Sequence, residues 1–116
     1  MIRNSRGGIG EERCWGKRAE WCDYTGTING KIVGVTVFDN PSNLRYPTYW
    51  HVRAYGLFAA NPFGISYFEG DKSLNGSLTV EKYDSLRFKY RILVHSGVIN
   101  PNALNGLFTD YCRIGG

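Results

Sequence analysis

The sequence predicts an all-β fold, an antiparallel β-sandwich with a short helix near the C-terminal end. Two observations support this prediction. Apolar runs rich in β-branched and aromatic residues recur between turn signals, and the longest of them is residues 31–38, K-I-V-G-V-T-V-F. The 15 glycines among 116 residues suit a turn-rich β protein better than a helical bundle. An apolar fraction of 42% can bury a core, so we expect residues 1–116 to form one domain or part of one.

The N-terminal third is expected to contain a lead-in and a hairpin. Residues 1–17 are polar and rich in glycine, which predicts an irregular lead-in with room for a short edge strand. A strand is expected over residues 19–24, with Trp21 and Asp23 on one face. The pair Asn29-Gly30 is typical of a tight hairpin turn. Residues 31–38 then form a central strand that is covered on both faces.

The middle of the chain combines a proline-rich loop with a strand that carries polar groups. Asn40-Pro41 and Tyr46-Pro47 predict an irregular loop. A strand is expected over residues 49–55, with Trp50, Val52 and Ala54 toward the core. Its opposite face would then carry the side chains of Tyr49, His51, Arg53 and Tyr55.

The second half is expected to add strands and the helix. Residues 65–68 are compatible with a short strand, and residues 78–80 are weakly extended. The clearest strand is residues 86–95, whose inward face would carry Leu86, Phe88, Tyr90, Ile92 and Val94. Asn100 is a favourable N-cap with Pro101 at the first helical position, which predicts a terminal helix over residues 100–112. Apolar residues recur at helical spacing in it, namely Leu104, Leu107, Phe108 and Tyr111.

Charge, cysteine content and hydropathy exclude several function classes. The net charge of +4 is modest and the basic residues alternate with acids, which indicates a solvated surface rather than a nucleic-acid interface. No run approaches the ~18 apolar residues of a membrane span, and no apolar signal segment follows Met1. The sequence leaves a cytoplasmic or an exported location open. Three cysteines without a CxxC pair favour buried thiols over zinc or a disulfide framework, although one disulfide stays geometrically open.

The most informative candidate site is the polar face of the strand over residues 49–55. An imidazole, a guanidinium and phenol hydroxyls from His51, Arg53 and Tyr55 together can orient and polarise a hydroxylated or anionic ligand. Flat aromatic rings can also stack on the apolar side of a sugar. A polar solvent face of an antiparallel sheet is an equally good interpretation of the same pattern.

The preceding loop offers further ligand-binding groups. Asp39, Asn43 and Arg45 bring a carboxylate, an amide and a guanidinium together within seven residues, a set that could hold a polyol. Turn capping is an alternative explanation of Asp39 and Asn43. His95 ends the strand over residues 86–95, and either histidine suits general acid–base work. The spacing of the histidines demands no metal site, so we expect no metal and no cofactor.

Five sequence blocks resemble the uncharacterised family DUF6807, which also carries the label "methane oxygenase PmoA". They are W-C-D-Y-T-G (21–26), F-D-N-P-S-N-L-R-Y-P (38–47), W-H-V-R-A-Y-G (50–56), A-N-P-F-G (60–64) and Y-R-I-L-V-H-S-G (90–97). The blocks occur in the family's order between about residues 10 and 113. Family members are usually more than twice as long, so the resemblance implies a partial domain, the C-terminal half of a longer sandwich.

The resemblance implies a jelly-roll or supersandwich fold in a soluble bacterial protein encoded near carbohydrate-processing genes. In one respect the chain departs from the family pattern, because many relatives have histidine where this chain has Asn40. That difference removes one ligand or base. The motif positions that carry over are Asp23, Asp39, Asn43, Arg45, His51, Arg53, Tyr55, Asn61 and His95.

Three function hypotheses follow. The first is a carbohydrate-active or carbohydrate-binding domain with a glycan or small-molecule ligand on a concave sheet face. In it His51, His95 and Asp39 would be catalytic, while Asn43, Arg45, Arg53, Tyr55, Asn61 and Asp23 would bind the ligand. The second is a non-catalytic binding or structural module that completes a larger sandwich or an oligomer, with self-association through exposed sheet edges. The third is a metal-dependent oxygenase, which would require bound iron or copper. None of the three involves nucleic acid or a membrane.

Overall fold

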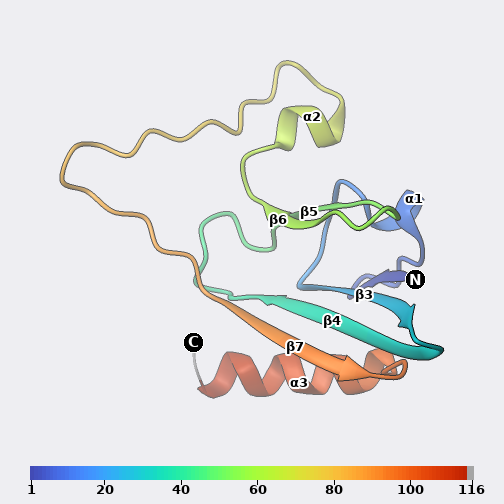
Figure 1. Ribbon diagram of the computed structural model, residues 1–116. Helices are drawn as coiled ribbons and strands as arrows, with labels where there is room; N and C mark the ends of the chain where they lie inside the picture. The colour runs from blue at the N-terminus through green and yellow to red at the C-terminus, as the bar shows by residue number, and fades with distance from the viewer. Residues whose placement is uncertain (115–116) are drawn as a thin grey trace.

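Two antiparallel sheets lie in successive layers, and a helix covers the outer face of the larger one (Figure 1). The computed structural model describes residues 1–114. The four-stranded sheet has the order β1-β3-β4-β7 and the three-stranded sheet the order β2-β5-β6. The strands are β1 (Ile2–Asn4), β2 (Lys17–Arg18), β3 (Trp21–Ile28), β4 (Lys31–Asp39), β5 (Tyr49–Val52), β6 (Phe58–Asn61) and β7 (Tyr90–Ser96). The helices are α1 (Glu11–Cys14), α2 (Ile65–Glu69) and α3 (Pro101–Ile114). This architecture confirms the predicted sandwich-like fold with a C-terminal helix.

The β3–β4 hairpin forms the centre of the larger sheet. Its turn is the predicted Asn29-Gly30, with φ angles of 51° and 77°, a left-handed geometry that these two residue types adopt readily. Cα pairing runs from Ile28 and Lys31 beside the turn to Trp21 and Phe38 at the far end. β3 extends four residues beyond its expected end, so the hairpin is longer than the sequence indicated.

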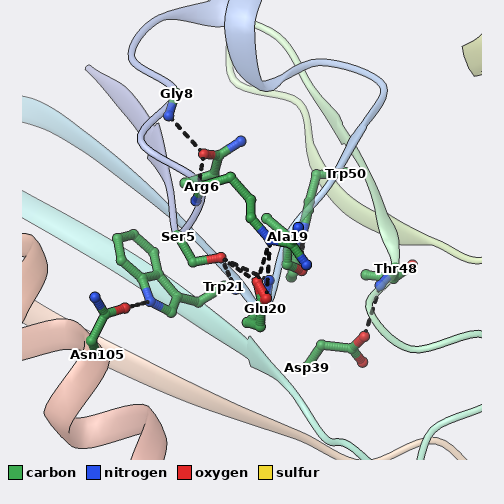
Figure 2. A network of polar contacts seen from close by, with 11 residues as sticks. Ser5, Arg6, Gly8, Ala19, Glu20, Trp21, Asp39, Thr48, Trp50 and Asn105 are labelled. Atoms are coloured by element: carbon green, nitrogen blue, oxygen red, sulfur yellow. Dashed lines mark hydrogen bonds and ion pairs between the residues drawn. The ribbon is translucent and has the colours of Figure 1, made fainter.

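The first core lies between the two sheets. Trp50 and Val52 from β5 and Cys22 from β3 are fully buried there. The indole Nε1 of Trp50 donates to the carbonyl of Ala19 at 2.9 Å (Figure 2), so the large ring is buried with its polar atom satisfied. The predicted inward positions of Trp50 and Val52 are confirmed. Ala54 does not join them, because β5 ends at Val52 and Ala54 is exposed in the following turn.

The second core lies between the four-stranded sheet and α3. Trp21 and Phe38 from the sheet pack against Leu104 and Tyr111 from the helix. Trp21 Nε1 donates to Asn105 of α3 at 2.8 Å, as Figure 2 shows. The helix begins as predicted, with the Asn100 side chain accepting from the backbone N–H of Asn102 at 2.7 Å. It continues to Ile114, two residues beyond the expected end.

Two segments differ from the predicted secondary structure. Residues 65–68 were expected to form a strand but belong to helix α2, which ends at Gly70 in a left-handed conformation. The chain beyond it, residues 70–89, contains neither helix nor strand. The lead-in is more ordered than expected, since it contributes β1, α1 and β2, and its Ile2 and Cys14 belong to the core between the sheets.

β7 turns toward the core the face that was predicted to point outward. It begins at Tyr90 rather than at residue 86, and Ile92 and Val94, which were expected to face inward, are 64% and 75% exposed. Leu93 instead packs against the core under α3. The pairing explains this result, because Leu93 lies opposite Thr36 on the helix-covered face while the second sheet does not reach over Ile92.

In residues 1–114 no helix has the length and apolarity that crossing a bilayer requires.

The two cores predict that truncating a side chain in α3 lowers stability much more than truncating one on the exposed face of β7. Leu104→Ala empties a fully buried position and should lower the free energy of unfolding by about 2–5 kcal/mol. Ile92→Ala on the exposed face should cost less than about 1 kcal/mol, contrary to the sequence pattern. Urea titrations of both variants measure the two values. A larger loss for Ile92→Ala than for Leu104→Ala would contradict this description of the sheet.

Candidate functional site

The predicted site residues lie at three separate places. The first is the outer face of the three-stranded sheet, the second is the loop between β4 and β5 with its surroundings, and the third is the helix-covered face of the four-stranded sheet. The three groups are, in that order, His51, Arg53 and Tyr55; Asp39, Asn43, Arg45 and Asn61; and Asp23 with His95. Their roles in binding and catalysis stay predictions, and the surroundings of each group decide which chemistry it can perform.

His51 lies within a cluster of aromatic rings on the outer face of β5. The ring of Trp15, from the turn after α1, approaches it edge-on at 6.1 Å between centroids. Tyr67 and Phe68 of α2 lie at 6.4 and 5.6 Å. The imidazole is therefore half-buried among apolar rings. We call Trp15, His51, Tyr67 and Phe68 the aromatic cluster.

Arg53 lies on the aromatic cluster, whereas Tyr55 points away from it. The Arg53 guanidinium stacks on the Trp15 ring at 4.4 Å and pairs with Glu11 at 3.5 Å. Glu11 also accepts a hydrogen bond from the backbone N–H of Ala54 at 2.8 Å, which fixes the turn after β5. Tyr55, beyond that turn, is 80% exposed. The edge of the cluster therefore presents one cation and one carboxylate.

A hollow of about 530 Å³ opens beside the aromatic cluster at α2. Tyr67, which is 64% exposed, contributes one wall, and Phe63, 42% exposed, contributes another. Its remaining lining residues are Gly64, Ser66, Gly70 and Lys72. Because Tyr67 contacts Trp15 at 5.5 Å, the hollow and the Arg53 edge belong to one continuous surface.

Sequence reasoning missed Trp15, Tyr67 and Phe68 as neighbours of His51. It also missed Phe63 and Lys72, which line the hollow. Trp15 lies in the segment expected to be irregular, and Tyr67 lies in the segment expected to be a strand. The glycines at 64 and 70 were a usable signal, since they bracket Ile65–Glu69 as the two ends of a short helix. That helix turns its aromatic residues back onto β5.

Asp39 and Asn43 serve the loop between β4 and β5. The Asp39 carboxylate is buried and accepts hydrogen bonds from the Asn43 side chain at 2.7 Å and from the backbone N–H of Thr48 at 2.9 Å. Burial raises the pKa of Asp39, because these two bonds offset its desolvation only in part. Asn43 also pairs with both backbone groups of Lys89. The contacts around this pair fix the entry of the chain into β7.

Arg45 and Asn61 are also bonded to backbone. The Arg45 guanidinium donates to the carbonyls of Pro62, Gly76 and Ser77, which holds the irregular segment after α2 against the body of the molecule. The Asn61 side chain accepts from the backbone N–H of Phe63 at 2.9 Å, as a turn-capping residue does. The Arg45 guanidinium therefore already donates three hydrogen bonds within the chain.

Asp23 and His95 form a buried hydrogen-bonded pair on the helix-covered face. His95 Nε2 lies 2.7 Å from Asp23 Oδ1, and Thr36 donates to the same oxygen at 2.6 Å. Arg3 Nη2 donates to the other oxygen at 2.8 Å. Loss of water alone would raise the pKa of Asp23, but the bonds from Thr36, Arg3 and His95 and the charge of Arg3 outweigh it and hold that pKa below its ordinary value.

Both ring nitrogens of His95 are engaged. Nε2 faces the Asp23 carboxylate, and Nδ1 lies 3.0 Å from the carbonyl oxygen of Gly97. The ring also lies against Gly34, where an added Cβ would come within 2.7 Å of Nε2. These contacts make His95 a fixed hydrogen-bond partner of Asp23.

The three cysteines are free thiols. Cys14 and Cys22 are buried, as expected, and desolvation raises the pKa of Cys14 to about 11. A thiol that stays protonated at neutral pH is a poor nucleophile and a poor metal ligand. Among residues 1–114 no three His, Cys, Asp or Glu side chains gather in a metal-binding arrangement.

The buried ion pair predicts a pH-dependent cost for Asp23→Asn. The variant leaves Arg3 and His95 without their carboxylate and should lose about 3–5 kcal/mol of stability at pH 7. Because the folded state lowers the pKa of Asp23, its contribution is complete above the ordinary carboxyl pKa of about 4 and is lost as the pH falls through the lower folded value.

The stability gap between wild type and Asp23→Asn should therefore be smaller at pH 2.5 than at pH 7 in urea titrations. Asp84→Asn, at an exposed position, is the matched control and should behave as wild type at both values. A gap that stays constant with pH would refute the ionic account of this cluster.

Comparison with known proteins adds the family. No curated protein and no solved structure matches this chain. A family model described as a family of unknown function, DUF6807, matches residues 1–109, which is nearly the whole chain. The expected resemblance is thereby confirmed. The chain, with its two stacked sheets and covering helix, belongs to the DUF6807 family.

Proposed function

We propose that this chain is a carbohydrate-binding β-sandwich domain and that the sugar lies on the aromatic cluster and the hollow beside it. The observation that carries the proposal is Tyr67, an aromatic side chain left 64% exposed at a hollow that holds a sugar-sized volume of about 530 Å³. An exposed aromatic ring beside a concavity offers a ligand a flat apolar face and a partly enclosed volume.

The groups around Tyr67 suit the two kinds of surface that a sugar presents. The C–H face of a pyranose packs on flat rings, and Tyr67 and Phe63 offer such rings on two walls. Hydroxyl groups need donors and acceptors at the edge, which Arg53, Glu11 and Lys72 can supply. The His51 ring lies 6.4 Å from that of Tyr67, within the aromatic cluster on which the sugar would lie.

The arrangement favours binding over catalysis. Glycoside hydrolysis by two carboxyl groups needs both of them at the scissile bond. Glu11 is the only carboxylate paired at the Arg53 edge in residues 1–114, while Asp39 and Asp23 are buried in bonds of their own. A lectin-like role requires no such pair.

Tyr67→Ala should lower the affinity for a bound glycan at least about tenfold, because it removes the stacking wall. The melting temperature should change by less than about 2 °C, since the side chain is mostly exposed. A glycan array identifies the ligand, and calorimetry with that glycan measures the affinity.

Tyr83→Ala is the matched control, a tyrosine that is 93% exposed on the segment between α2 and β7. It borders a different hollow, of about 490 Å³, which shares no lining residue with the proposed site. The variant should bind as wild type. Equal losses in both variants, or no binding by wild type across the array, would rule out this surface as a sugar site.

We propose self-association as a second candidate function, favoured by the uncovered side of β7. This strand is the edge of its sheet, and its neighbouring side chains Ile92 and Val94 are largely exposed. Protective charges or prolines are absent from the middle of the strand, Ile92–Val94, although such residues usually guard an exposed edge. Two copies of β7 can pair antiparallel about a twofold axis, which continues the sheet and places both apolar faces side by side. The proposed occupant is a second copy of this chain.

Val94→Lys tests this candidate directly. A lysine on the exposed face at the centre of the proposed contact should shift the protein to monomer at concentrations where wild type is dimeric, with little effect on folding. Sedimentation equilibrium measures the mass. A monomeric wild type at millimolar concentration would eliminate the candidate and would leave the sugar proposal untouched.

A further inference from the structure

Another cavity lies at the N-terminal end of α3 and shares no lining residue with the hollow beside the aromatic cluster. It has a volume of about 410 Å³ and opens between β1, the turn after β1 and the first residue of α3. Arg3 lies in the middle of β1, and Met1 and Ser5 flank the strand; all three border the cavity. Its lining residues are Met1, Arg3, Asn4, Ser5, Gly7, Gly8, Ile9 and Pro101.

Arg3 supplies a buried cation with an unused donor at this cavity. The residue is only 6% exposed, and its Nη2 donates to Asp23 at 2.8 Å. Its Nε–H is buried without any hydrogen-bond partner. An unmade hydrogen bond on a buried charged group costs free energy, and folded proteins rarely leave one without a reason. An acceptor brought by a ligand would satisfy it.

The surroundings of Arg3 also favour an anion. The Arg3 guanidinium is a permanent cation, and the Asp23 carboxylate paired with it is shared with Thr36 and His95. The N-terminal end of the α3 dipole adds partial positive charge beside Pro101.

The rim of the cavity is held in place before any ligand arrives. The Asn4 side chain accepts hydrogen bonds from the backbone N–H groups of Arg6 at 3.0 Å and Gly8 at 2.8 Å. Figure 2 shows the turn closed from the other side by Ser5, whose hydroxyl bonds to the side chain of Glu20. A rim fixed in this way binds without an ordering cost.

We propose that this cavity binds a small organic carboxylate, with the anionic group at Arg3 and the hydrocarbon part against Met1, Ile9 and Pro101. The apolar walls disfavour strongly hydrated inorganic anions, and the buried guanidinium disfavours neutral or cationic molecules. The site lies apart from the aromatic cluster and goes beyond the proposed sugar-binding role, so either proposal can fail without the other.

Butyrate is a suitable probe, with 1-butanol and butylamine as matched neutral and cationic molecules. Butyrate should produce saturable changes in the amide NMR signals of residues 3–9 and of the first turn of α3, whereas the other two should not. Arg3→Gln should abolish these changes. Because that variant also disturbs the buried ion pair, it cannot stand alone as a test.

Charge substitutions at Ile9 avoid this difficulty, since its side chain is 62% exposed at the cavity. Ile9→Glu places a negative charge at the site and should weaken butyrate binding at least about tenfold relative to Ile9→Lys. Both variants should fold as wild type does. Equal affinities in the two variants, equal responses to butyrate and 1-butanol, or no saturable response in wild type would each overturn the proposal.

Discussion

The fold depends on β3, a strand whose first three residues are completely buried although it has two faces. Trp21 and Asp23 face α3, and Cys22 faces the second sheet. A strand covered in this way can include a carboxylate only if its neighbours supply charge and donors. Arg3 from β1 and His95 from β7 do so, from strands on either side of the β3–β4 hairpin. Thr36 of β4 donates to the same carboxylate, so Asp23 ties all four strands of the larger sheet together.

This constraint explains which parts of the fold the sequence could predict. The hairpin at Asn29-Gly30 and the cap at Asn100 are local signals, and each acts wherever it occurs in a chain. Trp50 was recognisable as a core residue because exposing so large an apolar side chain to water is unfavourable. Which face of β7 points toward the core was not predictable in this way. Its two faces are both partly apolar, so the deciding factor is which face another element covers, and that information lies in α3 and in Asp23 rather than in β7.

The candidate site shows the same division between local and distant information. Alternation correctly placed Tyr49 and His51 on the face opposite Trp50, but it continued the strand past Val52 and so assigned Tyr55 to a surface that it does not reach. The rings of Trp15 and Tyr67 contact His51. They lie at the end of α1 and in α2, helices too short to show a clear periodicity in the sequence. Asp39 and Asn43 were recognisable as polar residues in a loop, yet their bonds to Thr48 and Lys89 depend on where the chain returns.

The placement of polar groups separates structural from binding roles in this domain. Asp39, Asn43, Asp23 and His95 have their polar atoms bonded within the chain, so a ligand would have to break existing bonds to reach them. Arg3 differs, because the contact that satisfies Asp23 leaves its Nε without a partner. These four motif positions therefore hold strands and loops together through bonds within the chain. Capacity for binding remains where a side chain has a free donor or an exposed ring, as Arg3 and Tyr67 do.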